Sequence, residues 1–446
     1  MTLDDRLVNA AVIGAAGKMG SGIALLLAHE MYLLKRKPEY ADAHFRLNLI
    51  DTSEAGLEGL LQYLKAQFIK KAEKSTILLR DIYADRDDLV ENAEIIDAYV
   101  DDVMSILRLG TDMNMASQSS LIFEAIVENI DIKIDLYKKL NAIAPKNAYF
   151  FTNTSSVPIQ LLNSGAGLGG RIIGFHFYNP PAVQRLAELI PAKETLAELK
   201  EMSMEIGARL RKKIFLSSDV AGFIGNGHFL RDALYAIEKV RRLEASYGYT
   251  GALYTVNKAS QDLLLRPMGI FQLMDYVGVD VMYFISKIMD RYIDGEDLSS
   301  ELIDTMYDAK VLGGQRSDGS QKDGFLKYEK NRPVGIYDLS AKEYTLFSDS
   351  DWAKKLDEKF GACPKSWSPW KVLLSDPARD DKLKAYFREL CEMETPGAKI
   401  ALDYLKRSKE IGRQLVDDGV AASKDDVNGV LMNGFYHLYG PINDYC

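Results

Sequence analysis

A glycine-rich turn near the start of the chain constrains the fold more than any other feature. Residues 14–20 read GAAGKMG, which has the spacing GxxGxxG, after an apolar run from Leu7 to Ile13 and before a helical segment at residues 21–29. In this context the first glycine allows a tight turn, the second lets the backbone approach a pyrophosphate, and the third lets helix and strand pack closely. The turn therefore predicts a dinucleotide site at the N-terminus of the helix. The residues expected to form it are Gly14, Gly17, Lys18, Met19 and Gly20.

A second predicted strand, at residues 45–50, ends at Asp51. An acid at this place accepts hydrogen bonds from the adenosine ribose hydroxyls and repels a 2′-phosphate, so NAD is favoured over NADP. The spacing from Gly20 exceeds the usual ~20 residues, because a polar segment at residues 29–44 has the character of an inserted loop. Asp51 also precedes a predicted helix, and the role of helix N-cap is the alternative.

The pattern of strands and helices divides the chain. Strands are expected at residues 121–126, 149–152 and 172–176, with helical segments between them. This alternation predicts an α/β fold, with a Rossmann-type doubly wound parallel sheet in residues 1–217. Strand signals fade after Ser218, and we expect all-helical C-terminal domains at residues 218–330 and 331–446.

The second helical domain is expected to be a diverged repeat of the first. Residues 255–275 and 423–444 both show a helix, a turn with glycine, and an apolar stretch that reaches Asp. Repeated patterns of this kind indicate duplicated structural units. Chance similarity between two helix–turn endings is the alternative.

Composition limits the partners and the compartment. The net charge of −9 argues against nucleic acid or an anionic membrane as the main partner, and no apolar run is long enough to span a bilayer. Cys363, Cys391 and Cys446 are far apart and lack CxxC spacing, which indicates neither a disulfide framework nor a metal site. The acidic N-terminus shows no targeting pattern. We expect a cytoplasmic protein in a reducing compartment.

One histidine has a carboxylate partner within reach in the sequence. His176 ends a predicted strand, and Glu188 follows in the segment LAELIP, which also has the character of a strand. A carboxylate on one ring nitrogen sets the tautomer and raises the basicity of the other nitrogen. The pair therefore suits removal of a hydroxyl proton by a general base. Without further context, a structural histidine at a strand end is the alternative.

Four blocks of sequence together resemble the 3-hydroxyacyl-CoA dehydrogenase family. They are GAAGKMGSGIA at 14–24, FEAIVEN at 123–129 with Lys133, NTSS at 153–156 leading to GFHFYNP at 174–180 and Glu188, and DVAGFIGN at 219–226 with RPMGIFQLMD at 266–275. The segment at 416–441 is similar to the second helical repeat of longer members. The resemblance implies NAD-dependent oxidation of a 3-hydroxyacyl-CoA to the 3-oxoacyl-CoA, a reaction of fatty-acid β-oxidation, without a metal.

The resemblance also implies roles for individual residues. His176 corresponds to the general base and Glu188 to its orienting partner, while Ser155 and Asn226 correspond to residues that bind the substrate oxygen or thioester. The residues that correspond to positions near the nicotinamide are Glu128, Lys133 and Asn179. Each also has a structural alternative: a turn or helix cap for Ser155, Asn226 and Asn179, and an ordinary surface charge for Glu128 and Lys133.

The resemblance is weaker for the residues that would bind the substrate. Lys70, Lys71 and Lys74 lie in the region that corresponds to the family's coenzyme A contacts, although a solvated helix face explains these lysines as well. Members usually carry Arg where this chain has Gly227, and the segment GGQRSDGSQKDGFLKY replaces a usual glycine–lysine–glycine–aromatic motif. The family's helical domains form homodimers, but a duplicated domain would cover the same surface within one chain.

Two other functions remain open from the sequence. A dehydrogenase of a free hydroxy acid would share the glycine turn and a helical second domain, but such enzymes generally use a lysine base. A non-catalytic protein that binds NAD or acyl-CoA would not require Ser155, His176, Glu188 and Asn226 together. These residues favour the 3-hydroxyacyl-CoA dehydrogenase.

Overall fold

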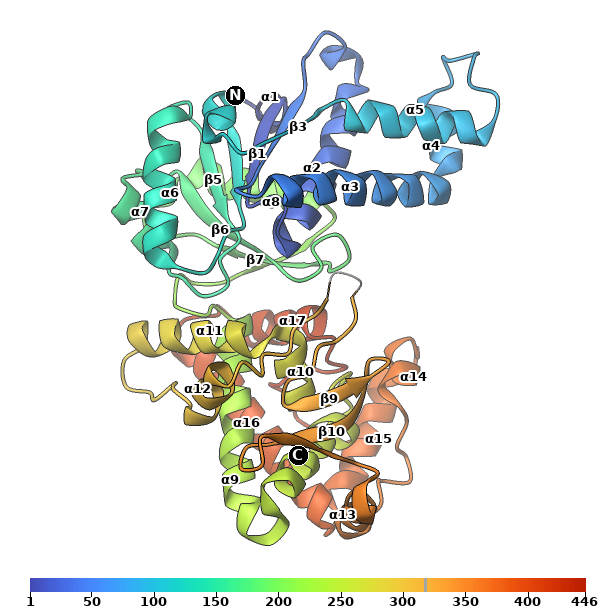
Figure 1. Cartoon of the computed structure of the whole chain (residues 1–446), viewed down its shortest axis with the longest axis vertical. Coiled ribbons are helices and arrows are strands. Elements are labelled where there is room, and N and C mark those ends of the chain that lie inside the picture. Colours follow the sequence, from blue (N-terminus) through green and yellow to red (C-terminus); the bar gives the residue numbers. More distant parts are fainter. Residues whose placement is uncertain (317–318) are drawn as a thin grey trace. The chain divides into compact units, whose positions relative to one another are not determined.

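The chain folds into two compact units. The computed structural model describes residues 1–316 and 319–446, and its two units comprise residues 1–219 and 220–446 (Figure 1). Long-range contacts concentrate within each unit, and each has its own hydrophobic core. No helix in the described part of the chain is long and apolar enough to cross a membrane.

The first unit is built on an eight-stranded sheet in the order β3-β2-β1-β4-β5-β6-β7-β8. All neighbouring strands are parallel except β6 and β7, which are antiparallel. The strand order changes direction at β1, which pairs with both β2 and β4, and ligands of such sheets bind at the carboxyl ends of the strands beside this point. The strands are β1 Asn9–Ile13, β2 Arg46–Ile50, β3 Leu107–Gly110, β4 Leu121–Glu124, β5 Tyr149–Thr152, β6 Ile172–Phe177, β7 Leu186–Ile190 and β8 Lys213–Leu216.

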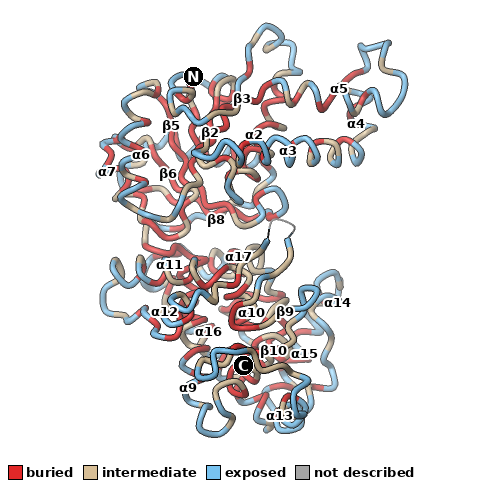
Figure 2. Tube along the Cα trace, in the orientation of Figure 1, coloured by how far each residue is buried: buried red, intermediate tan, exposed pale blue. Residues whose placement is uncertain are grey.

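Helices flank this sheet and bury it. Every residue of β4, β5, β6 and β7 is buried, which is the pattern of strands covered on both faces (Figure 2). The expected doubly wound α/β fold is thereby confirmed. The helices are α1 Leu3–Leu7, α2 Lys18–Lys35, α3 Glu54–Lys74, α4 Thr76–Ile82, α5 Asn92–Met104, α6 Ile130–Ile143, α7 Ile159–Ala166 and α8 Ala197–Arg209, with 3-10 turns η1 Pro38–Tyr40 and η2 Met113–Gln118.

One detail of the first unit differs from the sequence-based expectation, and another stretch was not assigned from the sequence. The segment at 29–44 is not all loop, because α2 continues to Lys35 and buries Met31, Tyr32 and Leu34. The stretch between Lys74 and Leu121 holds α4, α5 and the edge strand β3. Its strand is short, and Arg108 is exposed in its middle, so the apolar signal is weak. In Figure 1, α3, α4 and α5 extend away from the sheet of this unit.

The second unit is mostly helical, as expected, but it is not all-helical, because it also contains a small sheet. Its longest helix, α9 Gly225–Lys258, bends at Gly248 and continues into the π-helical turn η3 Ala259–Leu263, and α16 packs along both. A single hydrophobic core includes buried residues on both sides of residue 330. The domain boundary at residue 330 and the internal repeat therefore stay predictions. The other helices are α10 Ile270–Val277, α11 Val279–Tyr292, α12 Glu301–Asp308, α13 Trp352–Phe360, α14 Trp370–Leu374, α15 Arg379–Cys391, α16 Pro396–Asp417 and α17 Lys424–Gly434, with the 3-10 turn η4 Asp349–Asp351.

The second unit contains two features that the sequence did not indicate. A three-stranded antiparallel sheet, β9 Leu326–Glu329, β10 Arg332–Asp338 and β11 Glu343–Leu346, interrupts the helices. A disulfide joins Cys391 to Cys446, so the expectation of no disulfide was wrong. The chain end returns to α15, where Tyr445 stacks on Phe387 at 4.6 Å between ring centroids, and this packing brings together two cysteines that are 55 residues apart.

Candidate active site

The turn between β1 and α2 leaves room for glycine alone at its two ends. Gly14 has φ +76°, and a Cβ added there would lie 2.6 Å from the carbonyl oxygen of Ala125. A Cβ on Gly20 would lie 2.0 Å from the carbonyl oxygen of Gly14. The N-cap of α2 is Gly17, which has no side chain to cap the helix. These features leave the positive end of α2 accessible to an anion at the switch point of the sheet, and they fit a dinucleotide pyrophosphate.

Asp51 lies directly after β2, beside this turn. Its Oδ2 accepts a hydrogen bond from the backbone N–H of Ala16 at 3.0 Å, and its Oδ1 accepts one from Ser53 at 3.2 Å. The N-cap of α3 is Ser53, whose side chain accepts a hydrogen bond from the N–H of Gly56. Asp51 is therefore held against the glycine turn rather than used as the cap. A carboxylate has further lone pairs, and its position fits the adenosine ribose.

The register of β6 and β7 places His176 opposite Glu188. The His176 Nδ1 lies 3.1 Å from Oε1 of Glu188, and both side chains are buried. The sequence-based expectation that two strand ends bring these side chains together agrees with this geometry. The hydroxyl of Tyr178 donates a second hydrogen bond to the same oxygen at 2.8 Å.

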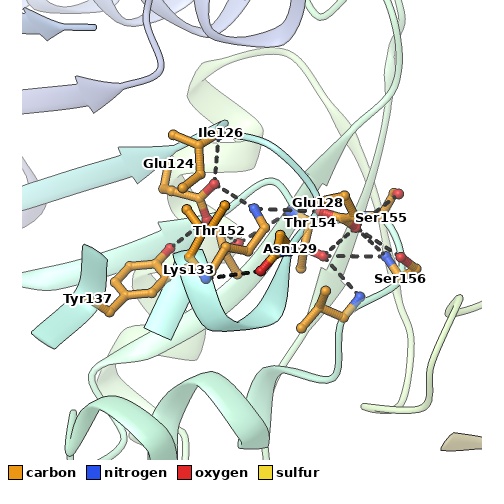
Figure 3. A network of polar contacts seen from close by, with 12 residues as sticks. Glu124, Ile126, Glu128, Asn129, Lys133, Tyr137, Thr152, Thr154, Ser155 and Ser156 are labelled. Carbon is orange, nitrogen blue, oxygen red and sulfur yellow. Dashed lines mark hydrogen bonds and ion pairs between the residues drawn. The ribbon is translucent and has the colours of Figure 1, made fainter. Parts of the chain in front are cut away.

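A buried charge network lies at the carboxyl ends of β4 and β5 (Figure 3). The ammonium of Lys133, in the first turn of α6, lies 2.6 Å from Oε1 of Glu124 and 3.6 Å from Oε2 of Glu128. Burial opposes the charge of Lys133, but Glu124 and Glu128 raise its pKa above the ordinary value. Glu124 also accepts hydrogen bonds from the N–H of Ile126 and from two hydroxyl groups, those of Tyr137 and Thr152.

Glu128 connects this network to the loop that contains Ser155. Its Oε1 accepts hydrogen bonds from the backbone N–H and the hydroxyl of Ser155 and of Ser156, and from the hydroxyl of Thr154 (Figure 3). Burial opposes the charge of Glu128, but Lys133 and these donors hold its pKa below the ordinary value. Glu128 is therefore a carboxylate at neutral pH, and it fixes the conformation of the Ser155 loop.

Asn179 follows β6 and precedes a cis proline, Pro180. Its Oδ1 is buried, and within the described part of the chain it accepts no hydrogen bond. Buried polar atoms are nearly always paired, so this oxygen is suited to a donor on a bound group. The carboxamide of nicotinamide has such a donor, and the position of Asn179 fits the cofactor expected there.

The remaining predicted site residues lie on three helices, α2, α3 and α9. Lys70 and Lys74 are exposed near the end of α3, and Lys71 between them is half-buried, with burial and then Arg211 lowering its pKa to about 8. Asn226 lies in the first turn of α9, in the second unit. Lys18 and Met19 begin α2.

Sequence reasoning missed two participants. Glu124 ends a buried strand, four residues before Glu128, and an acid within such an apolar run was a signal that it has a buried partner. Tyr178 lies two residues after His176, and this spacing places both side chains on the same face of an extended segment, which was the signal available for it.

The fold, the glycine turn and Asp51 define a dinucleotide-binding protein of the Rossmann type. Residues 9–220 match the NAD binding domain of 3-hydroxyacyl-CoA dehydrogenase, and residues 222–328 match the C-terminal domain of the same family. The chain belongs to the 3-hydroxyacyl-CoA dehydrogenase family, as an enzyme that uses NAD.

Curated relatives agree with this assignment, and a solved structure has a similar fold. A probable 3-hydroxybutyryl-CoA dehydrogenase from Deinococcus radiodurans is 31% identical over 245 residues, which cover 54% of this chain and 82% of the relative. The mitochondrial hydroxyacyl-coenzyme A dehydrogenase of Sus scrofa is 29% identical over 283 residues, which cover 63% of this chain and 79% of the relative. The crystal structure of 3-hydroxybutyryl-CoA dehydrogenase from Escherichia coli is similar in fold, with a TM-score of 0.63 and 21% identity over 97% of this chain and 90% of that one.

Proposed function

We propose that the protein oxidises the 3-hydroxyl group of a 3-hydroxyacyl-CoA thioester, with His176 as the general base and Glu188 as its orienting partner. The observation that carries this proposal is the buried contact between His176 Nδ1 and Glu188 Oε1, 3.1 Å apart on paired strands. A catalytic base needs a defined tautomer, and a buried carboxylate on one ring nitrogen provides it.

The path of the substrate proton follows from this arrangement. With its Nδ1–H donated to Glu188, the neutral ring of His176 presents Nε2 as the acceptor. Nε2 takes the proton of the substrate hydroxyl, and the charge of Glu188 stabilises the imidazolium that results. When bound, NAD supplies the two-electron acceptor for the oxidation.

Other residues support binding in this proposal. The Ser155 loop is held by Glu128, so the Ser155 hydroxyl has a defined position for the substrate oxygen. Asn226 is a further proposed contact to the substrate oxygen or thioester. Glu128, Lys133 and Asn179 hold the nicotinamide end of the cofactor, with Lys133 acting through its ion pair to Glu128. Lys70, Lys71 and Lys74 provide positive charge for the phosphates of coenzyme A.

The test compares His176→Gln with the wild-type full-length chain, using NAD and 3-hydroxybutyryl-CoA as the probe substrate. Loss of a positioned base lowers turnover roughly 10²–10⁴-fold, while the affinity for NAD stays unchanged. His44→Gln is the matched control, because His44 is exposed and lies outside the site. Near-normal turnover in His176→Gln would remove His176 from the mechanism.

The same assay distinguishes the proposed function from the alternative, in which the enzyme oxidises a free hydroxy acid. A dehydrogenase of that kind would use a lysine base, and Lys133 is a buried lysine among the predicted site residues. Its side chain is 1% exposed and its ammonium pairs with Glu124, so it is poorly suited to accept a proton from substrate. We expect activity with the thioester and none with free 3-hydroxybutyrate.

A further inference from the structure

Tyr178 and His176 share one acceptor atom. The Tyr178 hydroxyl donates to Oε1 of Glu188 at 2.8 Å, and His176 Nδ1 lies 3.1 Å from the same oxygen. The two rings are 4.7 Å apart between centroids and tilted by 39°. The side chain of Glu188 is fully buried. The contact is therefore a compact group of three side chains around one carboxylate oxygen, rather than a simple pair.

The strand geometry explains why these three side chains meet. Side chains two residues apart on an extended segment point to the same face, which places Tyr178 beside His176. Glu188 is the register partner of His176 on the antiparallel strand β7, so it lies within reach of both rings. Diagonal neighbours across such a strand pair are close enough for an aromatic side chain to reach.

The chemistry of the two donors differs. Burial and the charge of Glu188 raise the pKa of Tyr178 well above its ordinary value, so its hydroxyl remains a donor throughout the working pH range. A hydrogen bond from this hydroxyl withdraws part of the negative charge that Glu188 would otherwise present to His176. It also fixes the carboxylate in the rotamer that meets Nδ1.

We propose that Tyr178 is a positioning residue for the reaction, whose hydroxyl fixes Glu188 and tempers its attraction for the imidazolium form of His176. This inference rests on the proposed role of the His176–Glu188 pair. His176 faces the carboxylate of Glu188 from β7 and the ring of Tyr178 after β6. Glu128 and Lys133 belong to the network after β4 and β5.

The experiment is the pH profile of kcat/KM for Tyr178→Phe in the full-length chain, with NAD and 3-hydroxybutyryl-CoA as probes. Without the hydroxyl, Glu188 stabilises protonated His176 more strongly, so His176 becomes a base only at higher pH. We expect the acidic limb of the profile to move up by about half to one pH unit, since one unit corresponds to a tenfold change in a protonation equilibrium. The affinity for NAD should not change.

The matched control is Tyr83→Phe. Tyr83 is also buried and also donates to a carboxylate, Asp102, at 2.7 Å in the same unit. Removal of its hydroxyl should lower stability to a similar degree and leave the pH profile of kcat/KM in place. An equal shift in both variants would mean that the effect is a general consequence of lost stability, and would overturn the inference.

A second measurement covers the case in which Tyr178→Phe does not fold. Site-specific 3-fluorotyrosine at position 178 keeps the ring and makes the hydroxyl a stronger donor, so the acidic limb should move to lower pH. An unchanged profile in the fluorinated protein, or in Tyr178→Phe, would overturn the role of Tyr178. If His176→Gln is inactive and these profiles are unchanged, only this inference fails; if His176→Gln stays active, the proposed function fails first.

Discussion

The buried ion pair between Lys133 and Glu124 predicts a large loss of stability when one charge is removed. The two charged groups are 2.6 Å apart, and their side chains are 1% and 0% exposed. In Lys133→Met, Glu124 keeps its hydrogen bonds from Ile126, Tyr137 and Thr152, but its charge is left unpaired. Breaking a buried pair from one side costs about 3–5 kcal/mol. Glu128 also loses the cation that lowers its pKa.

Thermal unfolding, followed by circular dichroism, measures this effect. For a unit of the size of residues 1–219, about 1 kcal/mol shifts Tm by roughly 2–4 °C, so Lys133→Met should lower it by roughly 6–20 °C. The matched control is Lys138→Met, because Lys138 lies on the same helix, is 57% exposed and should change stability by about 0.5 kcal/mol or less.

The double variant Glu124→Gln with Lys133→Met tests the cause. It removes both charges while nearly preserving shape, so it should recover most of the stability lost in Lys133→Met. A loss below about 1 kcal/mol in Lys133→Met would refute the reasoning, because breaking a buried pair costs more than this. A double variant less stable than Lys133→Met would refute it too.

Two further predictions follow from other parts of the first unit. Gly20→Ala should abolish NAD binding in a calorimetric titration, because the added Cβ would lie 2.0 Å from the Gly14 carbonyl oxygen and force the turn apart. Gly59→Ala is the control, because there is open space around Gly59. Retained NAD affinity in Gly20→Ala would count against the turn as the cofactor site. Burial, Lys71 and Arg211 lower the pKa of His29 to about 3 in the folded protein. Below about pH 6.5 the unfolded chain therefore binds a proton at His29 that the folded chain does not. The contribution of His29 to the free energy of unfolding is fully present above this pH and falls as the pH is lowered, by up to about 2 kcal/mol at pH 5. In His29→Asn, the free energy of unfolding measured with urea should depend less steeply on pH. An identical pH dependence in this variant and the wild type would refute the assignment of the effect to His29.

The sequence alone was enough for the framework of the first unit. The strand at residues 9–13, the glycine turn and the following helix are local patterns, because strand periodicity and glycine conformational freedom act over a few residues. The proximity of His176 and Glu188 also followed from local reasoning, since the two residues belong to consecutive strands with a short connection. The strand β3 and the small sheet of β9, β10 and β11 were missed, because most of their residues are not buried and their apolar patterns are weak.

Only the tertiary structure decided which charges are buried and which side chains share a partner. From the sequence, a site role and an ordinary surface charge were both open for Glu128 and Lys133, and Glu124 was not identified. The parallel pairing of β4 with β5 is what brings the Ser155 loop to Glu128. Likewise, the cross-strand register gives Tyr178 and His176 one common oxygen, and chain packing joins Cys391 to the last residue. The physical reason is that local periodicity sets the direction of each side chain, whereas burial and pairing depend on the neighbours that distant segments supply.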